Sequence, residues 1–157
     1  NMPQLLAGKG DFNNWSNMQW AAVFAMMGLS NTTSGPTGAL SYYLGSNFNV
    51  PHGIAGGSFI GKVCTFNHKK GYHEYSKLAG WKNSLDLHKL NSEEKSYYVV
   101  SQINELLKKC NMPKSLKELG VLDNQFEGFF DFANNAKPAF NFNPISISEE
   151  EYSKIIN

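Results

Sequence analysis

Few side chains in this sequence could carry chemistry, and one histidine is the most informative of them. His52 stands between Pro51 and Gly53 at an expected helix start, where the positive end of the helix dipole favours the neutral imidazole that metals bind. A catalytic metal needs about three protein ligands and an open position, which one imidazole does not supply. His52 is therefore the candidate metal ligand, although a structural or vestigial role fits the isolated chain better.

Tyr42 is the candidate catalytic residue, because a phenol can donate a hydrogen bond or relay a proton when its surroundings tune it. Its neighbours are apolar and aromatic, namely Leu40, Tyr43 and Leu44. The competing interpretation is a tyrosine of the hydrophobic core, since buried aromatic residues are common and tuned ones are rare.

The remaining histidines and the two cysteines predict no site. His68, His73 and His88 lie in polar surroundings, which is typical of a solvated face. Cys64 and Cys110 fit neither a metal-ligand spacing nor a disulfide framework, so we expect two free thiols in a reducing compartment, and therefore in the cytoplasm. No catalytic triad is proposed, because the sequence alone places no base beside a nucleophile.

Charge and hydropathy argue against nucleic acid and membrane partners. The net charge is +1, and all fourteen basic residues are lysine, so the chain lacks the guanidinium fork that reads bases and phosphates. The longest apolar run, from Trp20 to Gly28, is about half the length that a bilayer requires. The first residues show no basic region followed by a hydrophobic stretch, so we expect neither a membrane span nor a signal peptide.

The charged residues are distributed unevenly along the chain. The first 61 residues contain only Lys9 and Asp11, whereas the other 96 contain thirteen lysines and twelve acidic residues. A segment so poor in charge and rich in Gly, Met and aromatic residues predicts either the buried centre of the domain or a surface that something else covers.

The elements that position the candidate residues are predicted to be helices. Asn13 or Asn14 can cap the first, which runs from Trp15 toward Gly28, and its second half is apolar all round, as in a buried helix. Apolar spacing, capping boxes and turn residues predict further helices over 37–44, 51–66, 92–110, 115–120 and 123–133, and one from residue 148 onward. No alternating strand of useful length is present, so residues 1–157 are expected to form a single all-α domain.

Two of these helices carry finer predictions. Gly53, Gly57 and Gly61 fall on one face of the helix after Pro51, where they would let another backbone approach closely. In the helix capped by Asn91 and Glu94, the side chains expected to face inward are Tyr97, Val100, Ile103, Leu106 and Leu107.

The segment from Ser30 to Phe66 resembles the signature of the iron-containing alcohol dehydrogenase family, His-x3-His-x9-His-Gly. The residues that carry the resemblance are Gly38-Ala-Leu-Ser-Tyr-Tyr-Leu-Gly45 and Asn49-Val-Pro-His-Gly-Ile-Ala55. Downstream, Met112-Pro-Lys-Ser-Leu-Lys-Glu-Leu-Gly-Val121 and Asn143-Pro-Ile-Ser-Ile-Ser-Glu149 are similar to the closing helices of that family. The resemblance covers nearly the whole chain and is most specific at Pro51-His52-Gly53.

The resemblance implies a multi-helix, dehydroquinate-synthase-like C-terminal domain. In that family a Rossmann-like N-terminal domain binds the nicotinamide cofactor, and the helical domain holds one divalent metal, iron or zinc. The implied partners are therefore the missing N-terminal nucleotide-binding domain and a small alcohol or aldehyde substrate; whether the chain forms a homo-oligomer stays open. The implied function is NAD(P)-linked interconversion of alcohol and aldehyde in the complete protein.

Mapped onto this sequence, the signature is only partly preserved. His52 matches its last histidine, whereas Gly38 and Tyr42 replace the first two. The family's earlier Asp-x3-His pair finds no match either, because the only acid before Trp15 is Asp11, and position 15 is Trp where a His would be required. The resemblance thus implies His52 as metal ligand and Tyr42 in place of a histidine near the substrate.

Two functional hypotheses remain open at this stage. In the first, the chain is part of an oxidoreductase and by itself is inactive, holding neither NAD(P) nor a tightly bound metal. The alternative is a metal-free pseudoenzyme that acts as a helical binding or scaffolding module, and the loss of histidine at positions 38 and 42 favours it.

Overall fold

The computed structural model describes residues 1–81 and 85–156, and these residues are helical with no strand among them. The elements in chain order are α1 (Met2–Leu6), α2 (Phe12–Leu29), α3 (Gly35–Phe48), α4 (His52–Lys69), the 3₁₀-helices η1 (Glu74–Trp81) and η2 (Leu85–Lys89), α5 (Ser92–Lys109), the 3₁₀-helix η3 (Asp123–Gln125), α6 (Phe126–Asn135), α7 (Lys137–Phe140) and α8 (Glu149–Ile156). The predicted all-α class is confirmed.

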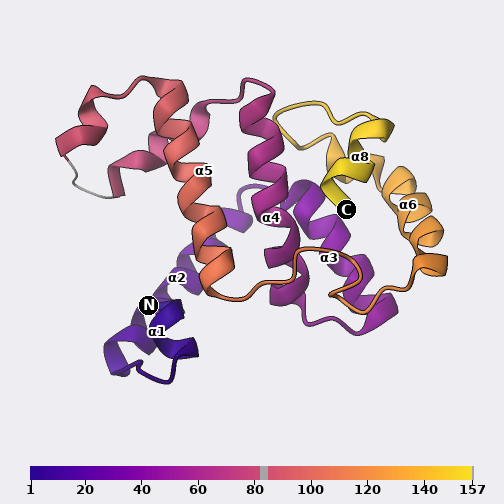
Figure 1. The fold of residues 1–157 in the computed structure, drawn as a ribbon, viewed down its shortest axis with the longest axis horizontal. Helices are drawn as coiled ribbons and strands as arrows, with labels where there is room; N and C mark the ends of the chain where they lie inside the picture. The colour runs from indigo at the N-terminus through magenta and orange to yellow at the C-terminus, as the bar shows by residue number, and fades with distance from the viewer. Residues whose placement is uncertain (82–84, 157) are drawn as a thin grey trace.

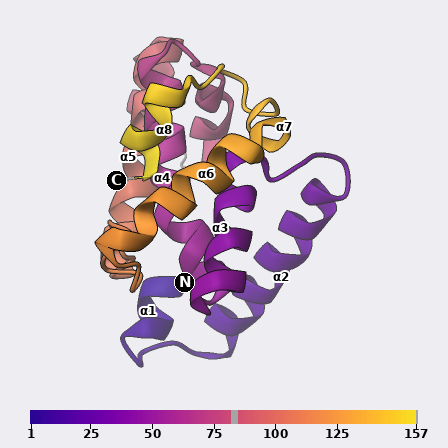
Figure 2. The ribbon, with the colours of Figure 1, turned by 90° about the vertical axis from the view of Figure 1, so that its right-hand side faces the viewer.

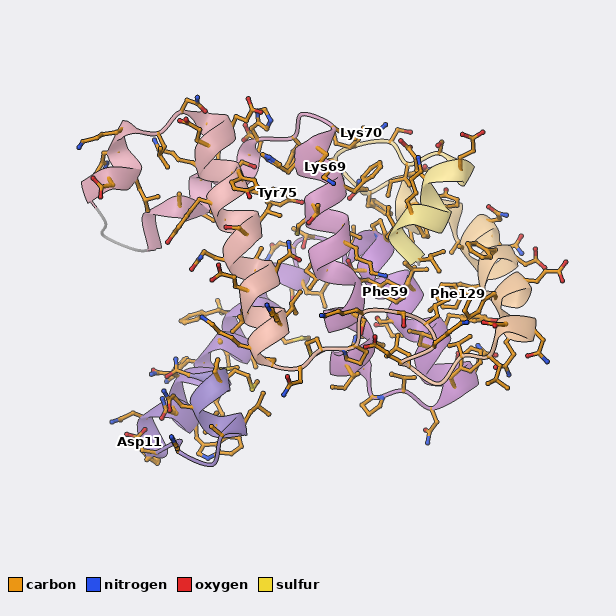
Figure 3. All side chains as sticks on the ribbon, viewed as in Figure 1. Asp11, Phe59, Lys69, Lys70, Tyr75 and Phe129 are labelled. Atoms are coloured by element: carbon orange, nitrogen blue, oxygen red, sulfur yellow. The ribbon has the colours of Figure 1, made fainter. Side chains whose placement is uncertain are left out.

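Helix α4 lies at the centre of the fold, with α5 on one side and α3, α6 and α8 toward the other (Figure 1). The hydrophobic core lies between α4 and the helices α3, α6 and α8. Its largest members include Phe59 of α4 and Phe129 of α6, whose ring centroids are 6.1 Å apart (Figure 3). Leu40 and Leu44 of α3 and Ile155 of α8 complete the contact around α4. Burial of these side chains is the main source of stability for this half of the molecule.

On its other side, α4 is approached closely because two of its residues are glycines. A Cβ at Gly57 would overlap the methyl group of Met112, and one at Gly61 would overlap the side chain of Asn104 on α5. The expectation of close approach is therefore confirmed at these two positions. It is wrong at Gly53, where nothing lies within 4 Å of an added Cβ.

Helix α5 turns a different face inward from the one expected. Val100 is buried, as predicted, but Tyr97 and Leu106 are 65% and 46% exposed, so the expectation for these two is wrong. The buried side chains are instead those of Ser96, Val99 and Val100. Among the described residues the main partners of α5 are α4 and η1, and together they cover a narrower stripe of α5 than the apolar spacing of the sequence predicts.

Two of the predicted capping boxes begin helices as expected. The Glu94 N–H donates to Asn91 Oδ1 at 2.9 Å, and the Asn91 N–H donates to the Glu94 carboxylate at 2.8 Å. At α8, the Ser148 N–H donates to the Glu151 carboxylate at 2.9 Å. Helix α2 also has a capping box, but Asp11 is its N-cap, and Asn14 supplies the reciprocal half. The predicted N-cap at Asn13 or Asn14 is therefore wrong by two or three residues.

The predicted helix from Ser115 to Gly120 is wrong, since this segment forms turns. The predicted capping hydrogen bond is nevertheless present, since the Glu118 N–H donates to Ser115 Oγ at 3.3 Å. The chain then closes at once: the Val121 N–H donates to the Leu116 carbonyl at 3.0 Å, and Gly120 takes a positive φ of 86°. Leu116 and Val121 are both buried in the core, so their burial favours a tight reversal over a continuing helix.

A pair of side-chain amides, from the buried Asn67 and the partly buried Asn143, fastens the C-terminal loop to the end of α4. The Asn67 side chain donates to Asn143 Oδ1 at 3.0 Å, and the Asn143 side chain donates back to Asn67 Oδ1 at 2.6 Å. Asn67 also donates to the Tyr75 hydroxyl at 3.0 Å, and burial raises the pKa of that phenol above its ordinary range. Every buried side-chain N and O atom among the described residues has a hydrogen-bond partner, so this polar cluster costs little desolvation energy.

The ion pair between Lys70 and Glu151 links the end of α4 to α8 and should make stability depend on pH. The hydrogen bond from Lys70, with that from the Ser148 backbone, lowers the pKa of Glu151 from 4.5 to about 2. A carboxylate whose folded pKa is depressed stabilises the fold above its unfolded pKa and loses this contribution as the pH falls through the folded value. We predict that Glu151→Gln lowers the denaturation midpoint at pH 7, and that its difference from the natural chain shrinks between pH 4.5 and 2.

Denaturant titrations at several pH values measure this effect. Lys70→Met should lose much of the same pH dependence, because the ammonium group is the main cause of the shift. A Glu151→Gln deficit that stays constant from pH 7 to pH 2 would contradict the prediction.

Candidate functional site

The two candidate residues are brought together by the turn between α3 and α4. Asn49 caps the C-terminus of α3 in a left-handed conformation with φ of 54°. The chain then reverses, and the Val50 N–H donates to the Leu44 carbonyl at 3.3 Å. His52 then begins α4 opposite the middle of α3. Its ring centroid lies 5.1 Å from that of Tyr42, with the two ring planes tilted by 38°.

The His52–Tyr42 pair lies at the surface of the described structure. Tyr42 is 65% exposed, so the competing interpretation of Tyr42 as a core residue is wrong. The neighbouring Tyr43 packs inward instead, with its ring centroid 5.1 Å from that of Phe129 and 4.5 Å from that of Phe132. Successive positions of a helix point about 100° apart, which is why one tyrosine can be in the core while the next is free for chemistry.

Ser41, which is buried, contacts His52 through its hydroxyl group. Its hydroxyl donates to the Gly38 carbonyl at 2.8 Å, which uses its only proton. Its lone pairs therefore face His52 Nδ1 at 3.4 Å, and this contact favours the tautomer that carries its proton on Nδ1. In that tautomer Nε2 keeps its lone pair, as a coordinating or proton-accepting imidazole requires.

The structure has no room for a larger side chain at position 38. A Cβ at this position would overlap the Oγ and Cβ atoms of Ser34, which precedes α3. The space that a side chain at position 38 would need is therefore filled by a neighbour. No pattern in the sequence signals this packing or the contact between Ser41 and His52.

The residues of this chain do not complete a metal site. No group of three or more His, Cys, Asp and Glu side chains that could hold a metal ion occurs within residues 1–81 and 85–156. His52 contacts the ring of Tyr42 and the hydroxyl of Ser41, and neither residue type is a preferred ligand of iron or zinc. Asp11 caps α2 at the outer end of the N-terminal segment (Figure 3). One imidazole is thus the contribution of the described residues.

The remaining titratable groups form structural contacts. His68 is partly buried, with Nδ1 at 3.0 Å from Ser96 Oγ and its ring beside those of His73 and Tyr97, so the expected solvated face is wrong for this residue. Cys64 and Cys110 are free, as predicted. Burial raises the pKa of the Cys64 thiol, which disfavours the nucleophilic thiolate.

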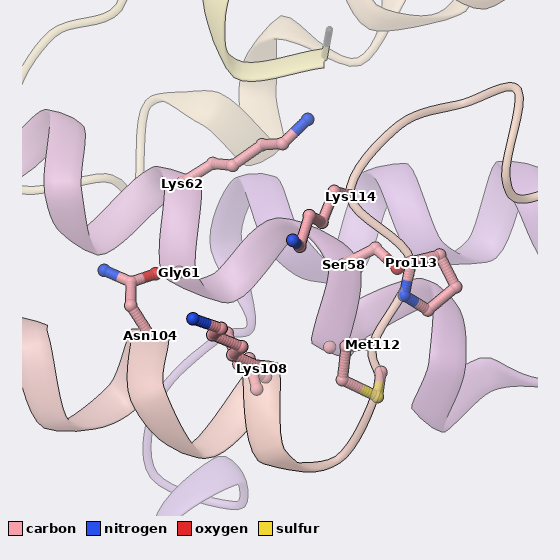
Figure 4. Close-up of a pocket in the computed structure, with 10 residues that line it drawn as sticks. Ser58, Gly61, Lys62, Asn104, Lys108, Met112, Pro113 and Lys114 are labelled. Carbon is pink, nitrogen blue, oxygen red and sulfur yellow. The ribbon is translucent and has the colours of Figure 1, made fainter.

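A separate hollow of about 260 Å³ lies between α4, α5 and the segment that follows α5 (Figure 4). Lys62, Lys108 and Lys114 stand at its edge. Burial lowers the pKa of Lys62, opposed by the charge of Glu118, and the Lys62 ammonium donates to the Ile156 carbonyl at 3.3 Å. Neither Tyr42 nor His52 lines this hollow, so it is distinct from the His–Tyr pair.

The described residues form a helical domain in which the rings of His52 and Tyr42 are in contact, and comparisons with known proteins identify its family. The whole chain, residues 1–157, matches the Fe-containing alcohol dehydrogenase family, C-terminal. The chain therefore belongs to that family. The resemblance inferred from the signature segment is confirmed.

The relatives are dehydrogenases. The chain is 27% identical over 150 residues to the NADPH-dependent butanol dehydrogenase of Clostridium saccharobutylicum, covering 94% of this chain and 38% of the relative. It is also 27% identical over 158 residues to the 1,3-propanediol dehydrogenase of Klebsiella pneumoniae, covering 99% of this chain and 40% of the relative. The chain thus spans about two fifths of the length of these relatives.

A crystal structure of 1,3-propanediol oxidoreductase has the same fold. The TM-score is 0.64 at 21% sequence identity, and the match covers 77% of this chain and 31% of the other. None of the helices in the described part of the chain combines the length and apolar character that crossing a bilayer would need.

The packing at Gly38 generates a prediction about stability. We predict that Gly38→Ala destabilises the fold by about 1–3 kcal/mol, the usual cost of overpacking, even though Ala favours a helix more than Gly does. Ser34→Gly in the same chain should recover most of the loss, because it removes the overlapping atoms. Urea titration measures both variants. Equal stability of Gly38→Ala and the natural chain would show that position 38 is open.

Proposed function

We propose that residues 1–157 form one helical domain, the C-terminal part of an alcohol dehydrogenase that interconverts a small alcohol and its aldehyde with NAD(P). The observation that carries the proposal is the family match over the whole length of the chain. The names of two relatives, a butanol dehydrogenase and a 1,3-propanediol dehydrogenase, support small alcohols as substrates. Nothing in the comparisons favours the metal-free scaffold.

The cofactor would be bound by an N-terminal nucleotide-binding domain that completes the protein. Dinucleotide sites use a strand, a glycine-rich turn and a helix N-terminus to hold the pyrophosphate. The described residues of this chain contain no strand, and the chain spans about two fifths of its relatives. Both observations support a complete protein in which the N-terminal domain binds the cofactor and this domain forms the substrate side of the cleft between them.

His52 is proposed as this domain's ligand to the metal of the family. Its exposed position at the start of α4 and the tautomer favoured by Ser41 leave Nε2 able to coordinate. A bound divalent metal would supply Lewis-acid polarisation of the alcohol oxygen. The other donors would come from outside the described residues, because no group of three or more His, Cys, Asp and Glu side chains that could hold a metal occurs among them.

Tyr42 is proposed as a hydrogen-bond donor and proton relay beside that site. Oxidation of an alcohol sends a hydride from the carbon to the nicotinamide and releases the hydroxyl proton. A phenol that touches the His52 ring on one side and solvent on the other can carry such a proton to water. The two free thiols support a reducing compartment, and we therefore place the protein in the cytoplasm.

The test is alcohol-dependent reduction of NAD⁺ and NADP⁺ by the complete gene product, with this chain alone as a comparison. We predict that Tyr42→Phe lowers kcat by about 10²-fold, as loss of a proton-transfer group does. His52→Ala should abolish activity together with bound metal, since catalytic metals need about three protein ligands.

Two matched controls come from the same chain. Tyr97 is as exposed as Tyr42 but lies on α5, and His88 is an exposed histidine of η2. Tyr97→Phe and His88→Ala should therefore keep full activity. Full activity in the Tyr42→Phe or His52→Ala variant would reject the assigned roles, and a complete protein that reduces neither cofactor with any short alcohol would reject the function.

A further inference from the structure

Helix α2 carries no charge, and its second half, from Trp20 to Leu29, is apolar and exposed. Its eighteen residues include no Lys, Asp or Glu, and every residue from 19 to 34 is exposed. The exposed large apolar side chains of this helix are Phe12, Trp15, Trp20, Val23, Phe24, Met26, Met27 and Leu29. The expectation of a buried helix is therefore wrong for this chain by itself, and the other expectation, of a surface that something else covers, remains.

The other described elements leave most of this helix uncovered. Its one substantial neighbour in the described structure is α1, and the contact is polar, because Asn14 and Asn17 donate to the Asn1 side chain at 2.9 Å and 3.3 Å. Figure 2 shows α2 standing apart from α3, α4 and α6. Burial of apolar surface is what normally stabilises a helix of this composition in a protein. Exposed to water, α2 lacks that stabilisation.

The apolar side chains occupy opposite sides of α2, which limits what can cover it. At about 100° per residue, Trp20, Phe24 and Met27 share one side. Trp15, Met26 and Leu29 lie on the side turned roughly 180° away from Phe24. A second copy related by a two-fold axis, or a single docked peptide, covers one stripe of a helix and leaves the other side in water.

A membrane surface also fits poorly. Helices that lie in the bilayer interface pair an apolar face with a polar face rich in Lys and Arg. Helix α2 has no such residue. A helix that is apolar all round is instead typical of the interior of a larger fold.

We propose that α2 is an interior helix of the complete protein, enclosed on both sides by polypeptide that precedes Asn1. This inference rests on the proposed function, which makes the chain the C-terminal part of a longer dehydrogenase. The length supports it, because about three fifths of each relative lies outside the match, and the family description places this chain at the C-terminal end.

Hydroxyl-radical footprinting read by mass spectrometry tests the enclosure residue by residue. Trp15 and Met26 report one side of α2, and Trp20 and Met27 report the other. In this chain alone all four should be oxidised rapidly, since Trp15 and Trp20 are 60% and 58% exposed. In the complete gene product all four rates should fall by about sixfold or more, because the four side chains are 58–60% exposed here and core side chains are at most 9% exposed. An added reporter peptide normalises the radical dose.

Three results would overturn the inference. The first is unchanged oxidation of all four residues in the complete protein. The second is protection of one side alone, which would identify a one-sided interface such as a second copy. The third is concentration-dependent protection of both sides in this chain alone, which would show that copies of the chain suffice.

Charged variants on the two sides give an independent measurement. Phe24→Lys and Met26→Lys should each lower the Tm of the complete protein and leave the Tm of this chain unchanged, because both positions are exposed here. Activity is recorded separately: a complete protein that protects α2 but reduces no NAD(P)⁺ would reject the proposed function and keep the inference. One that turns over alcohol while α2 stays accessible would reject the inference alone.

Discussion

The structure depends on α4 being packed on two sides at once. Its one side carries Phe59 into the core formed with α3, α6 and α8, and its other side admits α5 because Gly57 and Gly61 have no side chains. The N-terminus of the same helix presents His52, and its C-terminal end is fastened by Asn67 to the loop before α8. A helix fixed in this way is a rigid support, so the candidate site stands on an element that cannot easily move.

The left-handed turn at Asn49 brings the candidate residues together on this helix. It sets α3 against α4 so that Tyr42 and the buried Ser41 both contact His52, while Tyr43 remains in the core. Two tyrosines in succession thus have unrelated roles: one contributes packing energy, and the other is exposed beside an imidazole. These two residues provide one phenol and one imidazole nitrogen, which is fewer than the roughly three protein ligands of a catalytic metal site.

Sequence reasoning worked where the cause is local. The boxes at Asn91 and at Ser148 begin helices because their hydrogen bonds close within three residues, and the signature around His52 identified the family because those residues are contiguous. It failed where the outcome depends on distant partners. Tyr97 and Leu106 follow a helical period but find no element to cover them, and the segment after Ser115 is drawn into a turn by burial of Leu116. Ser34 filling the place of a side chain at Gly38 is likewise a contact that no spacing predicts.

The uncovered α2 and the incomplete ligand set both agree with the proposal that the chain forms part of a larger dehydrogenase. The most direct test of this account follows the hydride itself. The complete gene product would be incubated with butan-1-ol deuterated at the carbinol carbon and with NADP⁺, and the reduced cofactor analysed by mass spectrometry. The account predicts one deuterium in each reduced nicotinamide and aldehyde in equal amount; unlabelled reduced cofactor, or none at all with any short alcohol and either cofactor, would contradict it.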